Sequence, residues 1–348
     1  MFPAQALAET LTGEGWEVAM MTDARGAKHT GRIPADPIIE VEAASISFRK
    51  PLAAFGGLVK LARGVVQATH FMREWRPHVV AGFGGYPAFP AVRAAQSLGI
   101  PTVLHEQNAV LGRVNRAFAG KADAVASGFD ALSRMPKGVR HVATGNPLRA
   151  QVVDAVPDSY AAPGPQDDIQ LLVVGGSLGA RIVSQVVPKA VAALPDSLRA
   201  RLVVVQQTTE DELEAARATY AEAGVRATCE TFFSDIQTYL AAAHLVVARA
   251  GASSVSEIAL MGKPSILVPL AIAMDDHQTA NARSLADRDA AIILPESAFT
   301  PEALSGELER RLTDAHWLES AARAARDTAR PDAARALAAL VTQAARTD

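Results

Sequence analysis

The chain has 348 residues, of which 49% are apolar and 20% charged, a composition typical of a globular protein with about two domains. Lysine and arginine number 34 against 37 aspartates and glutamates, and the net charge of -3 argues against a nucleic-acid-binding protein. Cys229 is the only cysteine, which excludes a disulfide scaffold and a cysteine-ligated zinc site. The sequence shows neither an apolar run of the ~18 residues needed to span a membrane nor a signal-peptide pattern, so we expect a cytosolic protein.

The first predicted element is a helix whose first turns are residues 2–9 and which ends at Gly13 or Gly15. In a βαβ domain such a helix follows a strand and a ligand-facing turn. The sequence starts directly with the helix, so we expect the first strand of this fold to be absent from the chain.

Short runs rich in Val, Ile and Leu then alternate with longer Ala-rich amphipathic stretches, a pattern that predicts parallel sheets covered by helices on both faces. The rhythm breaks over residues 154–168, which are rich in proline and aspartate, and we place a domain boundary close to residues 145–147. The expected strands are residues 16–21, 78–81, 102–105, 122–126 and 140–143 before this boundary, and 169–174, 202–206, 245–248, 265–268 and 291–294 after it.

Both halves contain a strand that runs into a glycine-rich turn and a helix, at residues 79–86 and 172–180. Doubly wound sheets bind ligands at the carboxyl ends of their strands, and N–H groups at a helix start attract phosphate oxygens. The second turn matches neither the dinucleotide-binding G-x-G-x-x-G pattern nor a P-loop, which disfavours a nicotinamide cofactor. It predicts either a phosphate site or a plain tight turn.

Two further polar motifs follow expected strands in the second half. In residues 249–257 the Glu257 carboxylate could accept hydrogen bonds from ribose hydroxyls, or it could close a capping box with Ser253 or Ser254. In residues 275–281 the neutral amides of Gln278 and Asn281 suit sugar hydroxyls. Asp275, Asp276 and His277 could also suggest a metal site, which is disfavoured because adjacent side chains point in different directions and no further cluster of ligands is evident in the sequence.

The first half offers two polar strand ends and one basic segment. Residues 105–108 (HEQN) predict a ligand site, with a solvated loop capped by Asn108 as the alternative. Residues 145–149 predict a turn in which Arg149 could contact an anion. Residues 49–76 carry six cations and one acid among apolar side chains, which suits either an anionic membrane surface or a helix with one face packed on the sheet.

Six motifs occur in one order along nearly the whole chain: GFGGY at residues 82–86, HEQN at 105–108, GNPLR at 145–149, GGSLGAR at 175–181, RAGASSVSE at 249–257 and DDHQTAN at 275–281. Together they resemble the MurG family, the bacterial UDP-N-acetylglucosamine–lipid I N-acetylglucosaminyltransferases of peptidoglycan synthesis. The resemblance implies the GT-B fold, in which two Rossmann-like doubly wound domains face a cleft and a C-terminal helix returns to the N-terminal domain. We therefore expect residues 1–147 plus 330–348 to form the acceptor domain and residues 148–329 the donor domain.

For the donor UDP-GlcNAc the resemblance implies three kinds of contact. The pyrophosphate would lie near the two strand-to-helix turns, the uracil would meet the backbone at Phe233, and the two sugars would meet the carboxylate of Glu257 and the amide of Gln278. The full donor set is Gly176, Ser177, Gly179, Phe233, Arg249, Ser254, Glu257, His277 and Gln278.

For the acceptor lipid I the resemblance implies contacts to Gly84, Gly85, Tyr86, Asn108 and Arg149. The transfer to the C4 hydroxyl of MurNAc is inverting and gives lipid II, with no cofactor and no metal. Family members carry a Gly-Gly-Thr-Gly-Gly-His turn just before the segment that matches residues 1–4, and its histidine is the usual candidate for the base. In the present sequence only His105 and Glu106 can be nominated.

The resemblance also implies a peripheral protein on the cytoplasmic face of the bacterial inner membrane, with other cell-wall synthesis enzymes as partners. The expected membrane patch is Phe55, Leu58, Lys60 and Trp75. Two alternatives remain: another GT-B enzyme acting on a UDP-sugar, such as a glycolipid glycosyltransferase or a 2-epimerase, and a UDP-GlcNAc-binding module without catalysis.

Overall fold

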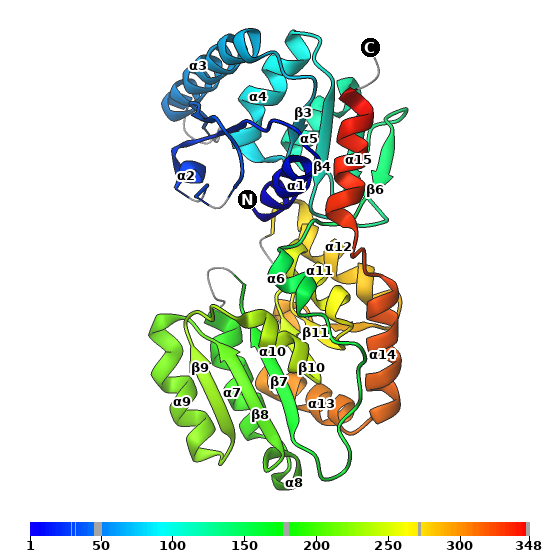
Figure 1. The fold of residues 1–348 in the computed structure, drawn as a ribbon. Coiled ribbons are helices and arrows are strands. Elements are labelled where there is room, and N and C mark those ends of the chain that lie inside the picture. Colours follow the sequence, from blue (N-terminus) through cyan, green and yellow to red (C-terminus); the bar gives the residue numbers. More distant parts are fainter. Residues whose placement is uncertain (29, 32, 45–50, 177–180, 271–272, 346–348) are drawn as a thin grey trace. The chain divides into compact units, whose positions relative to one another are not determined.

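The computed structural model describes residues 1–28, 30–31, 33–44, 51–176, 181–270 and 273–345. The chain divides into two units, which Figure 1 shows in the colours of the sequence. One unit contains Met1–Arg149 and Asp332–Asp348, and the other contains Ala150–Pro331. The chain therefore leaves the first unit once and returns to it for its last helix.

The first unit contains a four-stranded parallel sheet in the order β3 (Val80–Gly82), β4 (Thr102–Glu106), β5 (Ala124–Ser127) and β6 (His141–Ala143). β1 (Met20–Thr22) and β2 (Ile38–Glu40) form a separate parallel pair. The helices are α1 (Phe2–Gly13), α2 (Ala24–Ala27), α3 (Pro51–Trp75), α4 (Gly85–Ser97), α5 (Arg113–Phe118) and α15 (Ala333–Ala345), with a 3-10 turn η1 (Ala119–Lys121).

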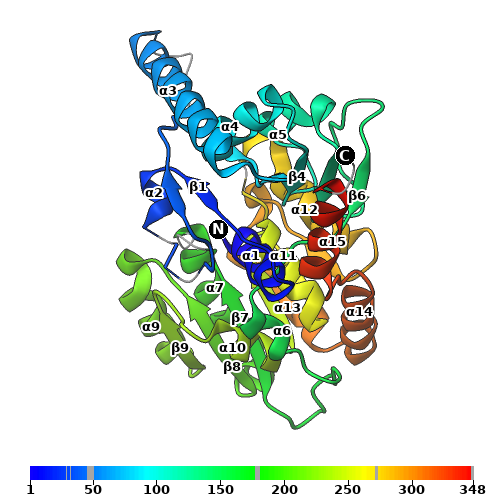
Figure 2. The same ribbon diagram turned by 45° about the horizontal axis from the view of Figure 1, so that its top comes forward.

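Helices cover both faces of the four-stranded sheet. On one face Leu7 of α1 and Leu337 of α15 pack against Val103, and Figure 2 shows these two helices side by side. On the other face α4 and α5 pack against Leu104 and Val125. This layering is the one that the continuous apolar runs predict, because a strand covered on both faces needs apolar side chains in both directions.

A cavity of about 1160 Å³ lies in the first unit. Its walls come from β1 and β3 and from α1, α3, α4 and α15, and they include the rings of Trp16, Phe71 and Trp75. β1 and β3 are each paired on one side only among the described residues, so the cavity lies beside two sheet edges.

The second unit contains a six-stranded parallel sheet in the order β12-β11-β10-β7-β8-β9. The strands are β7 (Ile169–Val174), β8 (Leu202–Gln207), β9 (Arg226–Glu230), β10 (Leu245–Ala248), β11 (Ser265–Leu267) and β12 (Ala291–Ile293). This is the doubly wound order of dinucleotide-binding folds, in which the strand order reverses between the first and fourth strands. Here the reversal falls between β7 and β10, which predicts a ligand site at the carboxyl ends of those two strands.

Helices and short turns connect these strands. The helices are α6 (Ala150–Asp154), α7 (Arg181–Ala192), α8 (Asp196–Arg199), α9 (Leu213–Glu222), α10 (Ile236–Ala242), α11 (Ala252–Met261), α12 (His277–Ala286), α13 (Pro301–Leu312) and α14 (Ala315–Asp327). The 3-10 turns are η2 (Glu210–Glu212), η3 (Met274–Asp276) and η4 (Glu296–Ala298). The main core joins α7, α9 and α13 to one face of the sheet through residues such as Val187, Tyr220 and Leu308.

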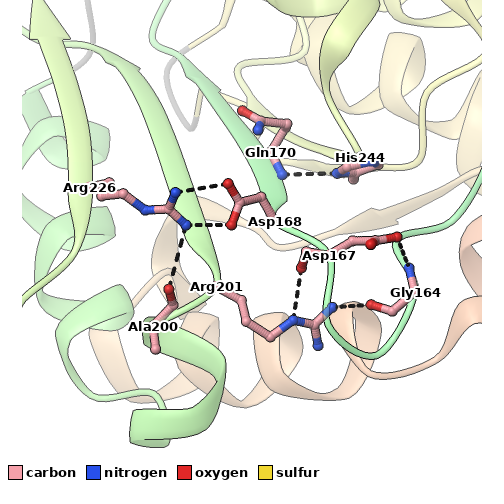
Figure 3. Close-up of polar contacts among 8 residues, drawn as sticks. All are labelled: Gly164, Asp167, Asp168, Gln170, Ala200, Arg201, Arg226 and His244. Carbon is pink, nitrogen blue, oxygen red and sulfur yellow. Dashed lines mark hydrogen bonds and ion pairs between the residues drawn. The ribbon is translucent and has the colours of Figure 1, made fainter.

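Polar contacts attach the proline-rich loop before β7 to the amino ends of the strands (Figure 3). Arg226 makes two hydrogen bonds to the carboxylate of Asp168, at 2.6 and 2.8 Å, and they lower the pKa of that exposed carboxyl. Nε of Arg201 donates to the carbonyl of Asp167 at 2.9 Å, and the amide of Gln170 donates to Nδ1 of His244 at 2.9 Å. These contacts lie at the end of the sheet opposite the predicted ligand site.

Nine of the ten expected strands are confirmed to within two residues at either end. The tenth, residues 16–21, is wrong for its first four residues, because α1 ends at Gly13 and only Met20–Thr22 pairs with β2. The sequence pattern did not predict β2 and β9. β9 is an edge strand with one buried residue in five, so it lacks the apolar run that marks a strand inside a sheet.

Among the residues that the structure describes, none of the helices combines the length and the apolar character needed to cross a bilayer. The longest, α3, has 25 residues and includes several charged side chains.

Candidate functional site

The turn after β7 has the geometry of a ligand-facing strand end. β7 ends at Val174, and Gly176 follows with φ of +90°, a conformation that glycine adopts without strain. A Cβ atom at Gly176 would meet no atom within 4 Å, so the glycine is required by its backbone conformation and not by a close neighbour. Ser177 and Gly179, the other predicted pyrophosphate contacts, lie outside the described residues.

The turn after β10 begins with Arg249, whose side chain is only 9% exposed. Nη1 of Arg249 donates to Oε2 of Glu296 at 3.0 Å and lies 3.2 Å from the carbonyl oxygen of Val268. The guanidinium therefore contacts η4 and the end of β11. Sequence reasoning missed Glu296 entirely, since nothing near it in the sequence resembles a site.

The helix after this turn corrects one interpretation. α11 begins at Ala252 with Gly251 as its N-cap, and no side chain caps it, so the capping box of Ser253 or Ser254 with Glu257 is wrong. Glu257 lies in the second turn of α11, and it is half-buried. With the capping role excluded, the ribose contact remains as the prediction for this carboxylate.

The segment after β11 brings the predicted sugar contacts onto α12, whose first residue is His277. Oε1 of Gln278 accepts a hydrogen bond from the amide of Leu270 at 3.0 Å, and Nδ2 of the fully buried Asn281 donates to the carbonyl of Ala250 at 3.1 Å. Gln278 thus joins α12 to the loop after β11, and Asn281 joins α12 to the turn after β10. Within the described ranges no group of three or more His, Cys, Asp or Glu side chains could hold a metal ion.

Phe233, predicted to offer its backbone to uracil, lies beyond the carboxyl end of β9. Its ring is buried and packs edge-on against Tyr239, with centroids 5.3 Å apart. Because the ring is used in packing, only the backbone of Phe233 is left to contact a base.

In the first unit Glu106 organises the loop after β4. Oε1 accepts from the amide and the side chain of Asn108 at 3.1 and 3.2 Å, and Oε2 accepts from the amide of Gly112 at 2.9 Å and from Nδ2 of Asn115 at 3.0 Å. A carboxylate has about four acceptor positions, and four donors occupy them. The structure therefore indicates that Glu106 positions the loop rather than takes a proton from substrate.

His105 is 1% exposed, and its Nε2 lies 3.1 Å from the carbonyl oxygen of Gly145. A carbonyl only accepts, so Nε2 carries the proton. Burial is the main reason that the pKa of His105 falls to about 4. This geometry argues against His105 as the catalytic base, because the imidazole is enclosed and has no access to a hydroxyl of substrate.

The predicted acceptor residues lie on or near the loops of this sheet. Gly84 caps α4 with φ of +71°, and a side chain there would meet Nδ2 of Asn115 at 2.9 Å; Gly85 follows it with φ of +67°. The Tyr86 hydroxyl donates to Asp23 at 3.1 Å, and the Arg149 guanidinium lies 4.7 Å from the ring centre of Phe2. The structure thus places Asn115 and Asp23 behind predicted site residues, although no motif marks either one.

The predicted membrane patch is divided by helix geometry. Phe55 and Leu58 on α3 are 70% and 51% exposed, and Lys60 is exposed beside them. Trp75 does not belong to this surface: it stacks on Phe71 with centroids 5.8 Å apart and lines the cavity. At 3.6 residues per turn, the twenty positions between Phe55 and Trp75 put them on nearly opposite sides of the helix.

Comparison with known proteins agrees with this architecture. Residues 1–127 match the glycosyltransferase family 28 N-terminal domain and residues 170–337 match the C-terminal domain of the same family. The crystal structure of Acinetobacter baumannii MurG superposes with a TM-score of 0.79 and 31% identity, covering 98% of this chain and 95% of that one. The protein is therefore a glycosyltransferase of the GT-B fold, built from two Rossmann-like domains.

Two relatives define the particular family. A Maricaulis maris (strain MCS10) protein named UDP-N-acetylglucosamine--N-acetylmuramyl-(pentapeptide) pyrophosphoryl-undecaprenol N-acetylglucosamine transferase is 51% identical over 97% of this chain and 92% of its own. A protein of the same name from Methylobacterium sp. (strain 4-46) is 46% identical over 99% and 94%. The chain belongs to the family of these N-acetylglucosamine transferases. A putative UDP-N-acetylglucosamine 2-epimerase from Listeria monocytogenes, at 18% identity and a TM-score of 0.66, shares the fold alone.

Proposed function

We propose that this protein transfers GlcNAc from UDP-GlcNAc to the C4 hydroxyl of MurNAc in lipid I, giving lipid II. The observation that carries the proposal is the 51% identity over nearly the whole length of a transferase named for this reaction. The second unit binds the donor at the switch point between β7 and β10, and the first unit binds the acceptor at the loops that contain Tyr86, Asn108 and Arg149.

Chemically, the acceptor oxygen forms a bond to C1 of GlcNAc, the bond from C1 to the diphosphate breaks, and the hydroxyl proton passes to a base. The UDP that leaves gains negative charge, and in this proposal the N–H groups at the start of α11 and at Gly176 stabilise it. In this proposal backbone N–H groups stabilise the departing diphosphate in place of a metal, and UDP-GlcNAc is a substrate rather than a cofactor. The described residues leave the base unassigned, because His105 is enclosed and the oxygens of Glu106 are occupied.

The experiment measures UDP release from UDP-GlcNAc with and without a soluble lipid I analogue. Acceptor-dependent release together with the disaccharide product supports the transferase. Release of UDP without acceptor, with formation of the C2 epimer of the sugar, would favour a 2-epimerase. UDP-GlcNAc binding without release under either condition would favour a binding module.

The Glu257 carboxylate is predicted to bind the ribose hydroxyls of UDP. Replacing it by alanine is expected to weaken UDP binding by ~10- to 100-fold, the value of a hydrogen bond to a charged group. Isothermal titration with UDP and with 2′-deoxy-UDP tests the contact directly. Wild type should prefer UDP, and Glu257→Ala should bind both ligands alike. Ser253→Ala, an exposed change on the same helix, is the control. A preference retained in Glu257→Ala would contradict the assignment.

We further propose that the protein binds the inner membrane surface from the cytoplasmic side through α3. Phe55, Leu58, Val59 and Val66 are exposed large apolar residues of this helix, and Lys60 and Arg63 are exposed beside them. An apolar stripe with flanking cations suits anionic lipid headgroups. Docking to other cell-wall synthesis enzymes is proposed only as a consequence of this location.

Replacing Phe55 and Leu58 together by serine is expected to reduce binding to vesicles of phosphatidylglycerol and phosphatidylethanolamine by tenfold or more, because each buried side chain contributes ~1.5–3 kcal/mol. Vesicle sedimentation measures the change, and transfer to a soluble acceptor should stay at the wild-type rate. Val153→Ser, an exposed valine on α6, is the matched control. Equal sedimentation of the double variant and wild type would rule out this surface.

A further inference from the structure

Arg249 connects the carboxyl ends of four adjacent strands, which is where the proposed function places the donor. Its backbone amide donates to the carbonyl of Val174, at the end of β7, at 3.2 Å. Its guanidinium lies 3.2 and 3.4 Å from the carbonyl oxygens of Val268 and Pro269, just after β11. The ion pair to Glu296 adds the segment after β12. One residue of the β10 turn therefore contacts the ends of β7, β11 and β12.

The guanidinium is directed into the unit. The side chain of Arg249 is 9% exposed and that of Glu296 is 26% exposed, and Nη1 and Oε2 lie 3.0 Å apart. A charge this deep is stable only when paired and hydrogen-bonded, and removing one partner leaves the other uncompensated. Glu296 supplies the carboxylate of this ion pair, so the orientation of the Arg249 side chain depends on it.

The same two loops are hydrogen-bonded to the predicted sugar contacts on α12. Gln278 accepts from the amide of Leu270 in the loop after β11, and Asn281 donates to the carbonyl of Ala250 in the turn after β10. A shift of either loop would therefore also move the α12 face that contains Gln278. The ion pair and these amides stabilise one arrangement of the turn, the loop and the helix.

We propose that Glu296 is a positioning residue for the donor site, which acts through Arg249 to keep the β10–α11 turn and the loop after β11 in the arrangement that binds a sugar nucleotide. Arg249 is likewise a positioning residue, and the diphosphate is met by backbone N–H groups. This inference rests on the proposed function, because it assumes that the donor binds at this edge.

The two roles for Arg249 predict opposite effects of Glu296→Gln. If Arg249 positions the loops, loss of the carboxylate should weaken UDP-GlcNAc binding about tenfold, chiefly through KM, and Arg249→Met should cause a similar loss. The double variant should be no weaker than the worse single variant, since both changes break one interaction. If Arg249 instead binds the diphosphate directly, Glu296→Gln should bind UDP-GlcNAc as tightly as wild type or more tightly, which would overturn the proposal.

Glu296→Asp keeps the charge and should recover binding to within about threefold of wild type; it is also the variant to measure if Glu296→Gln does not fold. Glu302→Gln, an exposed glutamate at the start of α13, is the matched control. Hydrogen exchange gives a readout that does not depend on the donor. The amides of Val268 and Leu270 should exchange faster in Glu296→Gln than in wild type. If wild type does not bind UDP-GlcNAc but these amides exchange faster in Glu296→Gln, the positioning role holds and the proposed function is wrong. If exchange is unchanged and Glu296→Gln binds UDP-GlcNAc normally, the positioning role is overturned.

Discussion

Replacing Glu106 by alanine is expected to lower the free energy of unfolding by about 3 kcal/mol, one of the two largest stability effects that we predict. The carboxylate accepts four hydrogen bonds, from Asn108, Gly112 and Asn115, and Glu106 is buried. A buried donor left without its charged partner costs about 1–3 kcal/mol, and the four losses are not additive because water can enter the space. Urea unfolding at neutral pH measures the change.

Glu74→Ala is the matched control for this experiment, because that side chain is 68% exposed on α3 and surface changes of this kind stay within ~0.5 kcal/mol. Transfer activity should fall in Glu106→Ala together with stability, since the loop that contains Asn108 loses its support. An inactive Glu106→Ala protein with wild-type stability would show that Glu106 acts on the substrate directly, against the positioning role.

The second large effect is acid sensitivity caused by His105. Its pKa is about 4 in the folded protein, against an ordinary value of 6.5 in the unfolded chain. Between these values the unfolded chain binds the proton and the folded protein does not, so stability falls as the pH decreases from about 6.5 towards 4. At about 1.4 kcal/mol for each pKa unit, the loss from this residue reaches about 3 kcal/mol near pH 4.

His105→Gln removes the titration and keeps a donor for the carbonyl of Gly145. The stability difference between wild type and this variant should therefore change with pH by about 3 kcal/mol, with the variant gaining relative to wild type as the pH falls. Urea unfolding from pH 7 to pH 4 measures it. His70→Gln, on the exposed side of α3, should follow wild type. Parallel curves for wild type and His105→Gln would mean that His105 takes up its proton at the same pH in the folded protein as in the unfolded chain, and would contradict the prediction.

The strands were predictable where both faces are buried. β7, β8 and β10 consist mainly of Val, Ile and Leu, because a strand between two helical layers must be largely apolar in both directions. β9 was not predictable in this way because it lies at the sheet edge, where four of its five residues are exposed and the apolar pattern is lost. The α11 start was misjudged for a local reason: serine and glutamate at the spacing of a capping box suggested a cap, but Gly251 occupies that position.

The site was predictable as a set of strand ends but not as a set of roles. Residues 105–108 lie at the carboxyl end of β4 as expected, yet the environment of His105 and Glu106 depends on Gly112, Asn115 and Gly145. No sequence pattern shows that these groups converge, because the parallel pairing of β4 with β5 and the start of α5 bring them together. The division of α3 into an exposed stripe and a packed Trp75 likewise depends on which side of the helix faces the sheet.

The sequence by itself determined the order of the strands other than β2 and β9, the glycine turns and the family, since each is expressed in local periodicity or in motifs of contiguous residues. The tertiary structure alone decided which polar side chains point inward. Arg249 and Glu296 are 47 positions apart and share no motif, yet they form an ion pair in which Arg249 is buried and Glu296 half-buried. They meet because the order β12-β11-β10-β7 places their strand ends at one edge of the sheet, where only a paired charge is stable away from water.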